Sequence, residues 1–311
     1  MALATSFPNS AFSYGFGKDV VTGNRFYVDS GAVNASDGNT GLSPARSFST
    51  VDAAVGACTA SNGDVVYVMP GHSETFSAAA AWALDVAGVR FQGLGTGTDR
   101  PKIIMDTATT VDINVSAANV SIDNFQFEAA FADIAKIFHL TAKQFHVTNC
   151  EFREQVATEN WILVIDCDGT TNGECDGLHF NNNVVIGADT KNENVLKSAA
   201  DLTGLEFNDN YIELGILNDD AIIECTTGKD VKSVQILRNR FLRLNTDGEL
   251  LLNANGTTGN TGICAYNLFG CLDIAAIVLI EAGTHIFQFE NYVTSELDLS
   301  GFLDPPAATD S

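Results

Sequence analysis

The sequence contains few basic residues. Lys and Arg together number 16, against 39 Asp and Glu, which gives the 311-residue chain a formal net charge of −23. The phosphates of nucleic acid and the headgroups of an anionic membrane would repel a chain this acidic. We therefore expect neither nucleic acid nor a membrane among its partners.

Long apolar runs are also missing, and no segment approaches the roughly 18 residues that a membrane-spanning helix requires. The first 20 residues have no early Lys or Arg and no continuous apolar core, so we expect no signal peptide. The seven Cys residues follow no repeated spacing, which favours free thiols in a reducing compartment. Cys167 and Cys175 flank one loop and could form a disulfide, although no other feature favours an oxidising compartment.

Cofactor-binding and nucleophile motifs are absent from the sequence as well. It contains no Gly-rich phosphate loop, no Cys-x-x-Cys pair and no nucleophile elbow. We therefore expect no cofactor.

What the sequence does contain is a repeated unit centred on asparagine. Each copy has apolar residues two positions apart, then Asn, then another apolar residue two or three positions later. The marker residues are Asn124, Asn149, Asn183, Asn210, Asn239, Asn267 and Asn291, with gaps of 25, 34, 27, 29, 28 and 24 residues. Such a period indicates stacked repeats of short strands. Asn suits a tight bend between strands, because it tolerates the left-handed backbone conformation.

A second strand precedes most of these units and aligns on one polar column. The column consists of His139, Asp166, Lys197, Glu224, Asn253 and Glu281. The residue after each is small, except for Leu140. Because no single coil of about 28 residues can bury its apolar face alone, successive coils must stack about 4.8 Å apart around a shared core.

These features predict an all-β fold, a right-handed parallel β-helix wound from a single chain. One apolar column would form an internal stack: Phe127, Phe152, Val185, Ile212, Phe241, Phe269 and Val293. A β-sandwich is the alternative fold, since it also tolerates irregular gaps, but it does not explain why both columns align.

We expect the β-helix to occupy residues 26–297, between an extended N-terminal arm (1–25) and a C-terminal tail (298–311). Within it, residues 49–58 predict a helix that caps the apolar end of the first coil. Ser49 or Thr50 stands at a plausible N-cap, and Val51, Ala54 and Val55 follow at helical spacing.

The N-terminal part resembles the start of pectate-lyase-like right-handed β-helix proteins. The shared pattern comprises Tyr27–Val28–Asp29, the Asp37–Gly38 loop, Pro44, Phe48 and Thr50 before the capping helix, and Gly63–Asp64 before the first coil. One departure is the three-residue gap between Pro44 and Phe48, where the family has two. The resemblance implies the fold more than the function, because the family includes polysaccharide lyases, glycoside hydrolases and non-catalytic phage tail and capsid proteins.

An enzyme of this kind would carry its catalytic groups on the outside of adjacent coils. Asp166, Lys197 and Glu224 would then be the candidates, with the two carboxylates about 9–10 Å apart. Lys197 would act as the base of a lyase, and the carboxylates would hold Ca²⁺. The simpler interpretation is that alternating charges on an exposed ladder pair with one another, and we therefore assign no catalytic residue.

A second outward column contains Ser121, His146, His179, Glu206 and Gln235. His146, His179 and Glu206 have the chemistry of zinc ligands, but side chains 4.8 Å apart on a flat ladder converge poorly, so we expect no metal. Arg238, Arg240 and Arg243 form the one basic cluster, and we expect them to pair with acids such as Glu213.

Four aromatic residues stand in the N-terminal arm: Phe7, Phe12, Tyr14 and Phe16. They are hard to leave in water, so we expect the arm to bind a neighbouring subunit or a larger lattice. Together with the resemblance, this favours a non-enzymatic structural protein of a bacteriophage virion, made in the host cytoplasm. The specific expectation is a homotrimeric capsid decoration protein that contacts the major capsid protein or another virion protein, and possible surface glycans. The alternative function is a polysaccharide lyase or glycoside hydrolase.

Overall fold

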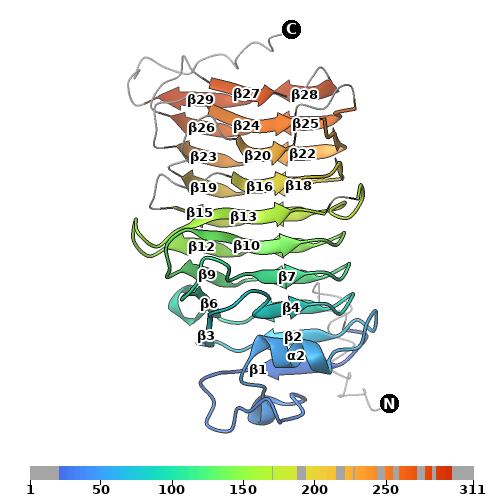
Figure 1. The fold of residues 1–311 in the computed structure, drawn as a ribbon, viewed down its shortest axis with the longest axis vertical. Helices are drawn as coiled ribbons and strands as arrows, with labels where there is room; N and C mark the ends of the chain where they lie inside the picture. Colours follow the sequence, from blue (N-terminus) through green and yellow to red (C-terminus); the bar gives the residue numbers. More distant parts are fainter. Residues whose placement is uncertain are drawn as a thin grey trace, which may run out of the picture.

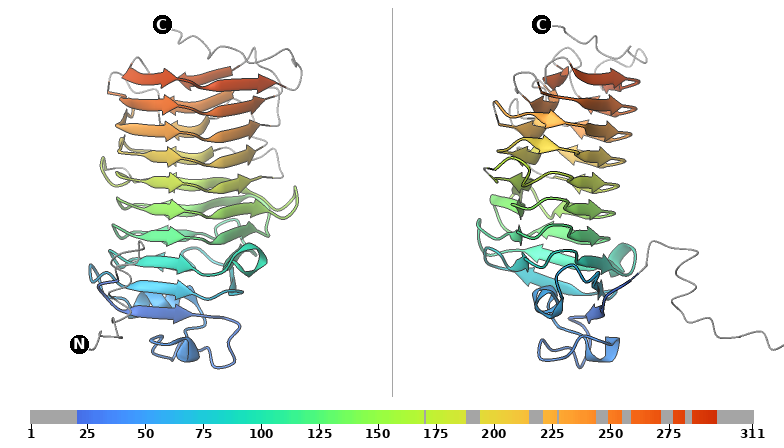
Figure 2. Two further views of the ribbon diagram at one scale, coloured as in Figure 1. Left: turned by 180° about the vertical axis from the view of Figure 1, so that it is seen from behind. Right: turned by 90° about the vertical axis from the view of Figure 1, so that its right-hand side faces the viewer.

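The computed structural model describes residues 21–169, 171–187, 194–214, 221–226, 228–243, 249–254, 259–271, 277–281 and 285–295. These residues form a parallel β-helix whose coils stack along one axis, from the N-terminal base to the C-terminal end (Figure 1). Each coil passes through three sheets in turn, and the winding is right-handed (Figures 1 and 2). The predicted fold is therefore confirmed, and the β-sandwich alternative is wrong.

The ten-stranded sheet, here sheet A, contains β1 (Arg25–Val28), β2 (Val65–Val68), β5 (Arg90–Gly93), β8 (Ser121–Asp123), β11 (His146–Thr148), β14 (His179–Asn181), β18 (Glu206–Asn208), β22 (Val234–Leu237), β25 (Gly262–Ala265) and β28 (Ile286–Phe289). The nine-stranded sheet B contains β3 (Ser73–Phe76), β6 (Lys102–Met105), β9 (Gln126–Ala129), β12 (Glu151–Glu154), β15 (Val184–Ile186), β19 (Tyr211–Leu214), β23 (Arg240–Arg243), β26 (Leu268–Cys271) and β29 (Tyr292–Ser295).

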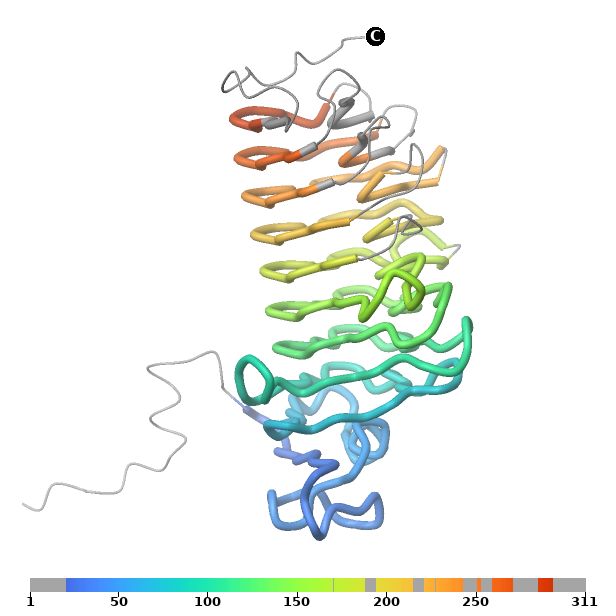
Figure 3. The backbone as a smooth tube through the Cα atoms, turned by 90° about the vertical axis from the view of Figure 1, so that its left-hand side faces the viewer, coloured from blue at the N-terminus to red at the C-terminus, as the bar shows by residue number. Residues whose placement is uncertain are grey.

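The eight-stranded sheet C contains β4 (Trp82–Leu84), β7 (Ile113–Val115), β10 (Ile134–Leu140), β13 (Trp161–Cys167), β16 (Asn194–Ser198), β20 (Ala221–Cys225), β24 (Glu249–Ala254) and β27 (Ile277–Glu281). A small parallel pair, β17 (Leu202–Thr203) and β21 (Val231–Lys232), joins two neighbouring coils. Figure 3 shows how the successive coils follow one another along the stack.

The core consists of apolar columns that run along the axis. The predicted internal stack is confirmed from Phe127 to Phe269, because these residues pair in register and are buried. Val293 continues the register on β29, and its side chain lies outside the described part. Phe127 and Phe152 are fully buried and stack with their ring centroids 5.1 Å apart, and Phe241 and Phe269 stack at 4.8 Å. Each coil thus buries its aromatic rings against the next, which is why no coil is stable alone.

The asparagine markers occupy two positions rather than one. Asn124 and Asn149 adopt the left-handed conformation at the bend between sheets A and B, with φ of 64° and 56°. The other five markers lie one position later and are buried: Asn183, Asn210, Asn239, Asn267 and Asn291. The bend role that we predicted for them is wrong, because the left-handed position before them belongs to Asn182, Asp209, Arg238, Tyr266 and Glu290.

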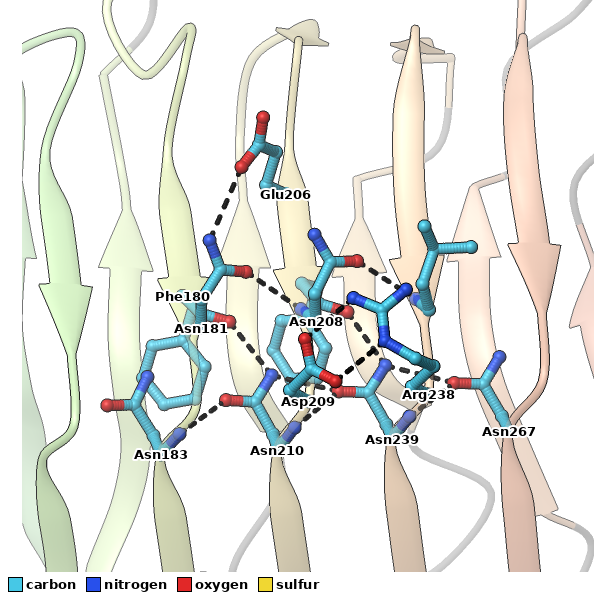
Figure 4. A network of polar contacts seen from close by, with 12 residues as sticks. Phe180, Asn181, Asn183, Glu206, Asn208, Asp209, Asn210, Arg238, Asn239 and Asn267 are labelled. Carbon is cyan, nitrogen blue, oxygen red and sulfur yellow. Dashed lines mark hydrogen bonds and ion pairs between the residues drawn. The ribbon is translucent and has the colours of Figure 1, made fainter.

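The five buried asparagines form a ladder of hydrogen bonds along the axis, and Figure 4 shows the part from Asn183 to Asn267. The backbone N–H of Asn210 donates to Oδ1 of Asn239 at 2.9 Å, and that of Asn239 donates to Oδ1 of Asn267 at 2.8 Å. Each Nδ2 donates to a carbonyl of the preceding coil, as from Asn239 to Phe207 at 2.7 Å. The carboxamides therefore satisfy backbone groups that the bends would otherwise bury without partners.

The base of the stack is covered by helix α2 (Val51–Ala57), within the predicted range 49–58. The Thr50 side chain accepts from the Ala53 N–H at 3.3 Å, and Val51, Ala54 and Val55 are buried. Two short 3-10 helices, η1 (Pro44–Arg46) and η2 (Gly97–Asp99), lie in the connecting loops. The cap helix is therefore where the sequence placed it.

Two of the expected segments stand at the ends of the chain. Residues 1–20 of the expected N-terminal arm and the whole expected tail lie outside the described residues. Within the described ranges, no helix is long and apolar enough to cross a membrane.

Candidate functional site

The polar column on sheet C has the register that the sequence predicts. Neighbouring coils pair His139 with Asp166, Asp166 with Lys197, Lys197 with Glu224, Glu224 with Asn253, and Asn253 with Glu281. Asp166, Lys197 and Glu224 therefore lie on three successive coils, as an outward catalytic column would require.

The contacts around this column engage its charges in ion pairs. Lys136 Nζ lies 2.6 Å from Asp166 Oδ2, and Lys197 Nζ lies 3.4 Å from Glu224 Oε2. Asp168 contacts His139 Nε2 at 2.7 Å. The two carboxylates thus each face a lysine, which is the arrangement of a ladder of paired charges. Lys136 and Asp168 were missed, because one lies three residues before the column on its strand and the other lies in the loop after β13.

The histidine column on sheet A also has the predicted register. The rings of His146 and His179 stack at 4.0 Å with an interplanar angle of 2°, and His179 Nδ1 lies 3.5 Å from Glu206 Oε2. Parallel rings direct their nitrogens side by side rather than toward one point. In the part of the chain that the structure describes, no three His, Cys, Asp or Glu side chains group as metal ligands.

A shallow polar groove of about 460 Å³ follows the corner between sheets A and B. Its lining includes Gln92, Arg100, Asp123 and Asn149. Asp123 accepts hydrogen bonds from Gln92 Nε2 at 2.5 Å and from Asn149 Nδ2. Much of its polar lining is therefore engaged within the protein. Part of this groove was visible in the sequence, since two of the asparagine markers, Asn124 and Asn149, line it.

The arginine cluster pairs with neighbouring acids only in part. Arg238 contacts Asp209 with two hydrogen bonds of 2.7 Å, so it pairs with an acid as expected, although the acid is Asp209 and not the Glu213 given as an example. Arg240 instead lies over the ring of Tyr211, whose hydroxyl donates to Glu213. Asp209 was missed because it stands at the left-handed bend position one coil before Arg238, which sequence spacing alone did not align. The side chain of Arg243 lies outside the described part.

Cys167 and Cys175 are free thiols, and both are fully buried. Burial raises the pKa of Cys167 well above its usual range, and a hydrogen bond with Cys175 raises it further. Cys175 Sγ also contacts the carbonyl of Leu140 at 3.5 Å. The disulfide that the spacing allowed is not formed.

The last two coils carry an exposed apolar patch that the sequence analysis did not identify. We call it the C-terminal apolar patch, and its residues are Ile263, Tyr266, Phe287, Phe289 and Tyr292. Phe287 is 75% exposed, and Tyr266 packs edge-on against Phe289 with ring centroids 5.3 Å apart.

The patch arises because two outward columns change from polar to apolar residues toward the C-terminal end. The histidine column runs from Gln235 to Ile263 and then to Phe287. On sheet B, the column that contains Arg240 continues through Leu268 to Tyr292. Continuing the histidine column by two coils would have found the patch in the sequence. Exposed apolar patches of this kind mark surfaces that bind other proteins.

The expected partner-binding residues Phe7, Phe12, Tyr14 and Phe16 lie outside the described residues. The patch is therefore the surface with the clearest chemistry of protein association among the residues that the structure describes.

Comparison with known proteins gives one match of overall architecture. No family model matches the sequence, and no curated protein matches it. A solved structure of a rhamnogalacturonan lyase aligns over 90% of this chain and 89% of its own, with 12% identity and a TM-score of 0.43. A match at this level carries no information on activity.

Proposed function

We propose that this protein is a non-enzymatic structural component of a bacteriophage virion. Its role would be that of a homotrimeric capsid decoration protein bound to the major capsid protein or another virion protein. The observation that carries the proposal is the C-terminal apolar patch, where five large apolar side chains, Phe287 and Tyr292 among them, are exposed together.

Three features of the molecule support such a role. The strong negative charge opposes non-specific binding to nucleic acid, while the patch offers exposed apolar side chains to a protein partner. The aromatic and carboxamide columns form a continuous core, as a rigid rod requires. The lysines beside Asp166 and Glu224 engage charges that a catalytic column would need free.

The experiment is mass spectrometry of purified phage particles from a host that carries the gene. The chain should be present at a stoichiometry set by the particle's symmetry, and it should remain after density-gradient purification. The variant Phe287→Ser/Phe289→Ser should fold but be lost from the particles. Absence of the wild-type chain from intact particles would overturn the proposal.

A polysaccharide lyase or glycoside hydrolase is the second candidate function. It is favoured by the register that places Asp166, Lys197 and Glu224 on successive coils. Under this alternative, Asp166→Asn, Lys197→Met and Glu224→Gln should each abolish release of oligosaccharides from an acidic or neutral polysaccharide. Under the structural proposal, the wild-type protein should release none.

A further inference from the structure

Among the described residues, strand β28 is the last strand of sheet A. In the described residues it pairs with β25 alone, so its other edge carries backbone groups without a strand partner. Phe287 and Phe289 alternate along this strand and are both exposed. An exposed edge strand flanked by apolar side chains is the usual template for strand addition by another segment.

The sequence contains one segment with matching chemistry. Residues 1–20 carry one Lys and one Asp, so their side chains have no net charge, whereas the whole chain has −23. Phe12, Tyr14 and Phe16 stand at every second position, which places their side chains on one face of an extended strand. This segment can therefore approach an acidic protein without electrostatic repulsion and present three aromatic rings together.

Residues 12–16 cannot reach the C-terminal apolar patch of their own chain. From Val21 at the base, full extension spans at most about 18 Å to Phe16 and about 32 Å to Phe12. Nine strand-to-strand steps separate β1 from β28 in sheet A, which is about 43 Å at 4.8 Å per step. The three alternating aromatics cannot all lie on the patch of their own chain.

The size of the patch favours a strand over a flat contact. A large aromatic side chain has about 150–250 Å² of surface that can be buried. From the exposed fractions of the five patch residues, the patch therefore has on the order of 500 Å² of exposed surface. A stable protein interface buries about 800 Å² per partner. The patch is therefore too small for a patch-to-patch dimer but fits one extended segment.

We propose that residues 12–16 of a second copy add to β28 as a further strand, so that their aromatic side chains stand on the outer face of sheet A beside Phe287 and Phe289. The proposal rests on the structural role proposed above and names the partner of its docking surface. Within a parallel trimer all bases lie at one level, so this contact joins two copies end to end, with the base of one near the last coils of the other.

The test separates the arm from the patch in two variants of the full chain. One variant lacks residues 1–20 and keeps the patch, while the other is Phe287→Ser/Phe289→Ser and keeps the arm. By sedimentation velocity, neither should form the end-to-end complex alone, but an equimolar mixture should form it. When each variant is measured by itself, its constant for end-to-end association should be at least about tenfold below that of the wild type.

Controls and contrary outcomes follow from the same measurement. Val156→Ser removes a valine that is 49% exposed after β12, on the middle coils, and should leave association unchanged. Thermal melts by circular dichroism must show that both variants fold. If the arm-deleted chain associates as well as the wild type, or if the mixture forms no complex, the proposal is wrong. Because this readout needs no virion, it can fail while the particle experiment succeeds, and the reverse.

Discussion

The imidazole rings of His146 and His179 lie face to face at 4.0 Å on adjacent coils of sheet A. Burial lowers the pKa of His146, and the neighbouring His179 lowers it further, against a smaller opposing effect of Glu206. A stacked pair of this kind tolerates neutral rings and resists protonation of both.

This pair predicts that stability falls on the acid side. The pKa of His146 is lower in the folded state than the value of about 6.5 expected in the unfolded chain. As the pH falls through about 6.5, the unfolded chain therefore binds more protons than the folded protein, and the free energy of unfolding decreases. Urea unfolding at pH 7.5 and 5.5 should show a loss at the lower pH that is smaller in His146→Gln. Equal losses in both proteins would contradict the role of His146.

The same contact can be measured directly by NMR titration. Replacing His179 with Gln should raise the pKa of His146, because the second-largest cause of its depression is removed. Burial remains, so the value should stay below that of an unperturbed histidine. An unchanged titration midpoint would show that the rings do not interact.

The asparagine ladder predicts a large cost for one internal carboxamide. Asn239→Ala should remove the acceptor of the Asn210 N–H and the donor to the Phe207 carbonyl, at a cost of about 3 kcal/mol in the free energy of unfolding. Asn182 is a matched control, because it has φ of 57° at the bend. Asn182→Gly should cost at most about 1 kcal/mol, since glycine adopts this conformation freely and the variant loses only an exposed hydrogen bond to Asn149.

The aromatic column predicts a graded response to shortening a side chain. Phe152→Ala should cost about 3–5 kcal/mol, because the ring stacks on Phe127 in a fully buried site. Phe152→Leu should cost clearly less, since it leaves a smaller cavity. Chemical denaturation measures both, and equal effects would show that the cavity does not set the cost.

The buried thiols predict selective protection from alkylation. Burial raises the pKa of Cys150 and Cys225 to about 12, so thiolate is scarce at pH 8. Iodoacetamide should leave both residues unmodified in the native protein and modify them in urea, as read by peptide mass spectrometry. Rapid native modification of either residue would contradict its buried position.

The columns of the β-helix were predictable because their signal repeats. A period-2 apolar pattern and a small residue after each polar one placed Asp166, Lys197 and Glu224 in register from sequence alone. The cap helix followed from the spacing of Val51, Ala54 and Val55 and from a good N-cap residue.

The positions of the asparagines and the partners of the charged residues could not be predicted in the same way. They depend on shifts of one residue or on contacts between coils. Asn149 and Asn183 both follow an apolar segment, yet one is at the left-handed bend and the other is inside, because asparagine suits both positions. The partners of Asp166 and Arg238 come from an adjacent coil and a position outside the aligned column. Side-chain reach, which spacing does not encode, decides such pairs.

The carboxamide ladder has a direction, because each rung receives its acceptor from the coil that follows it. Asn267 donates its backbone N–H to Oδ1 of Asn291, so the bend of one coil is completed only when the next is in place. Shortening the chain from its C-terminal end would strip the acceptor from the coil left outermost. Unravelling should therefore begin at that end and advance coil by coil toward the helix-covered base.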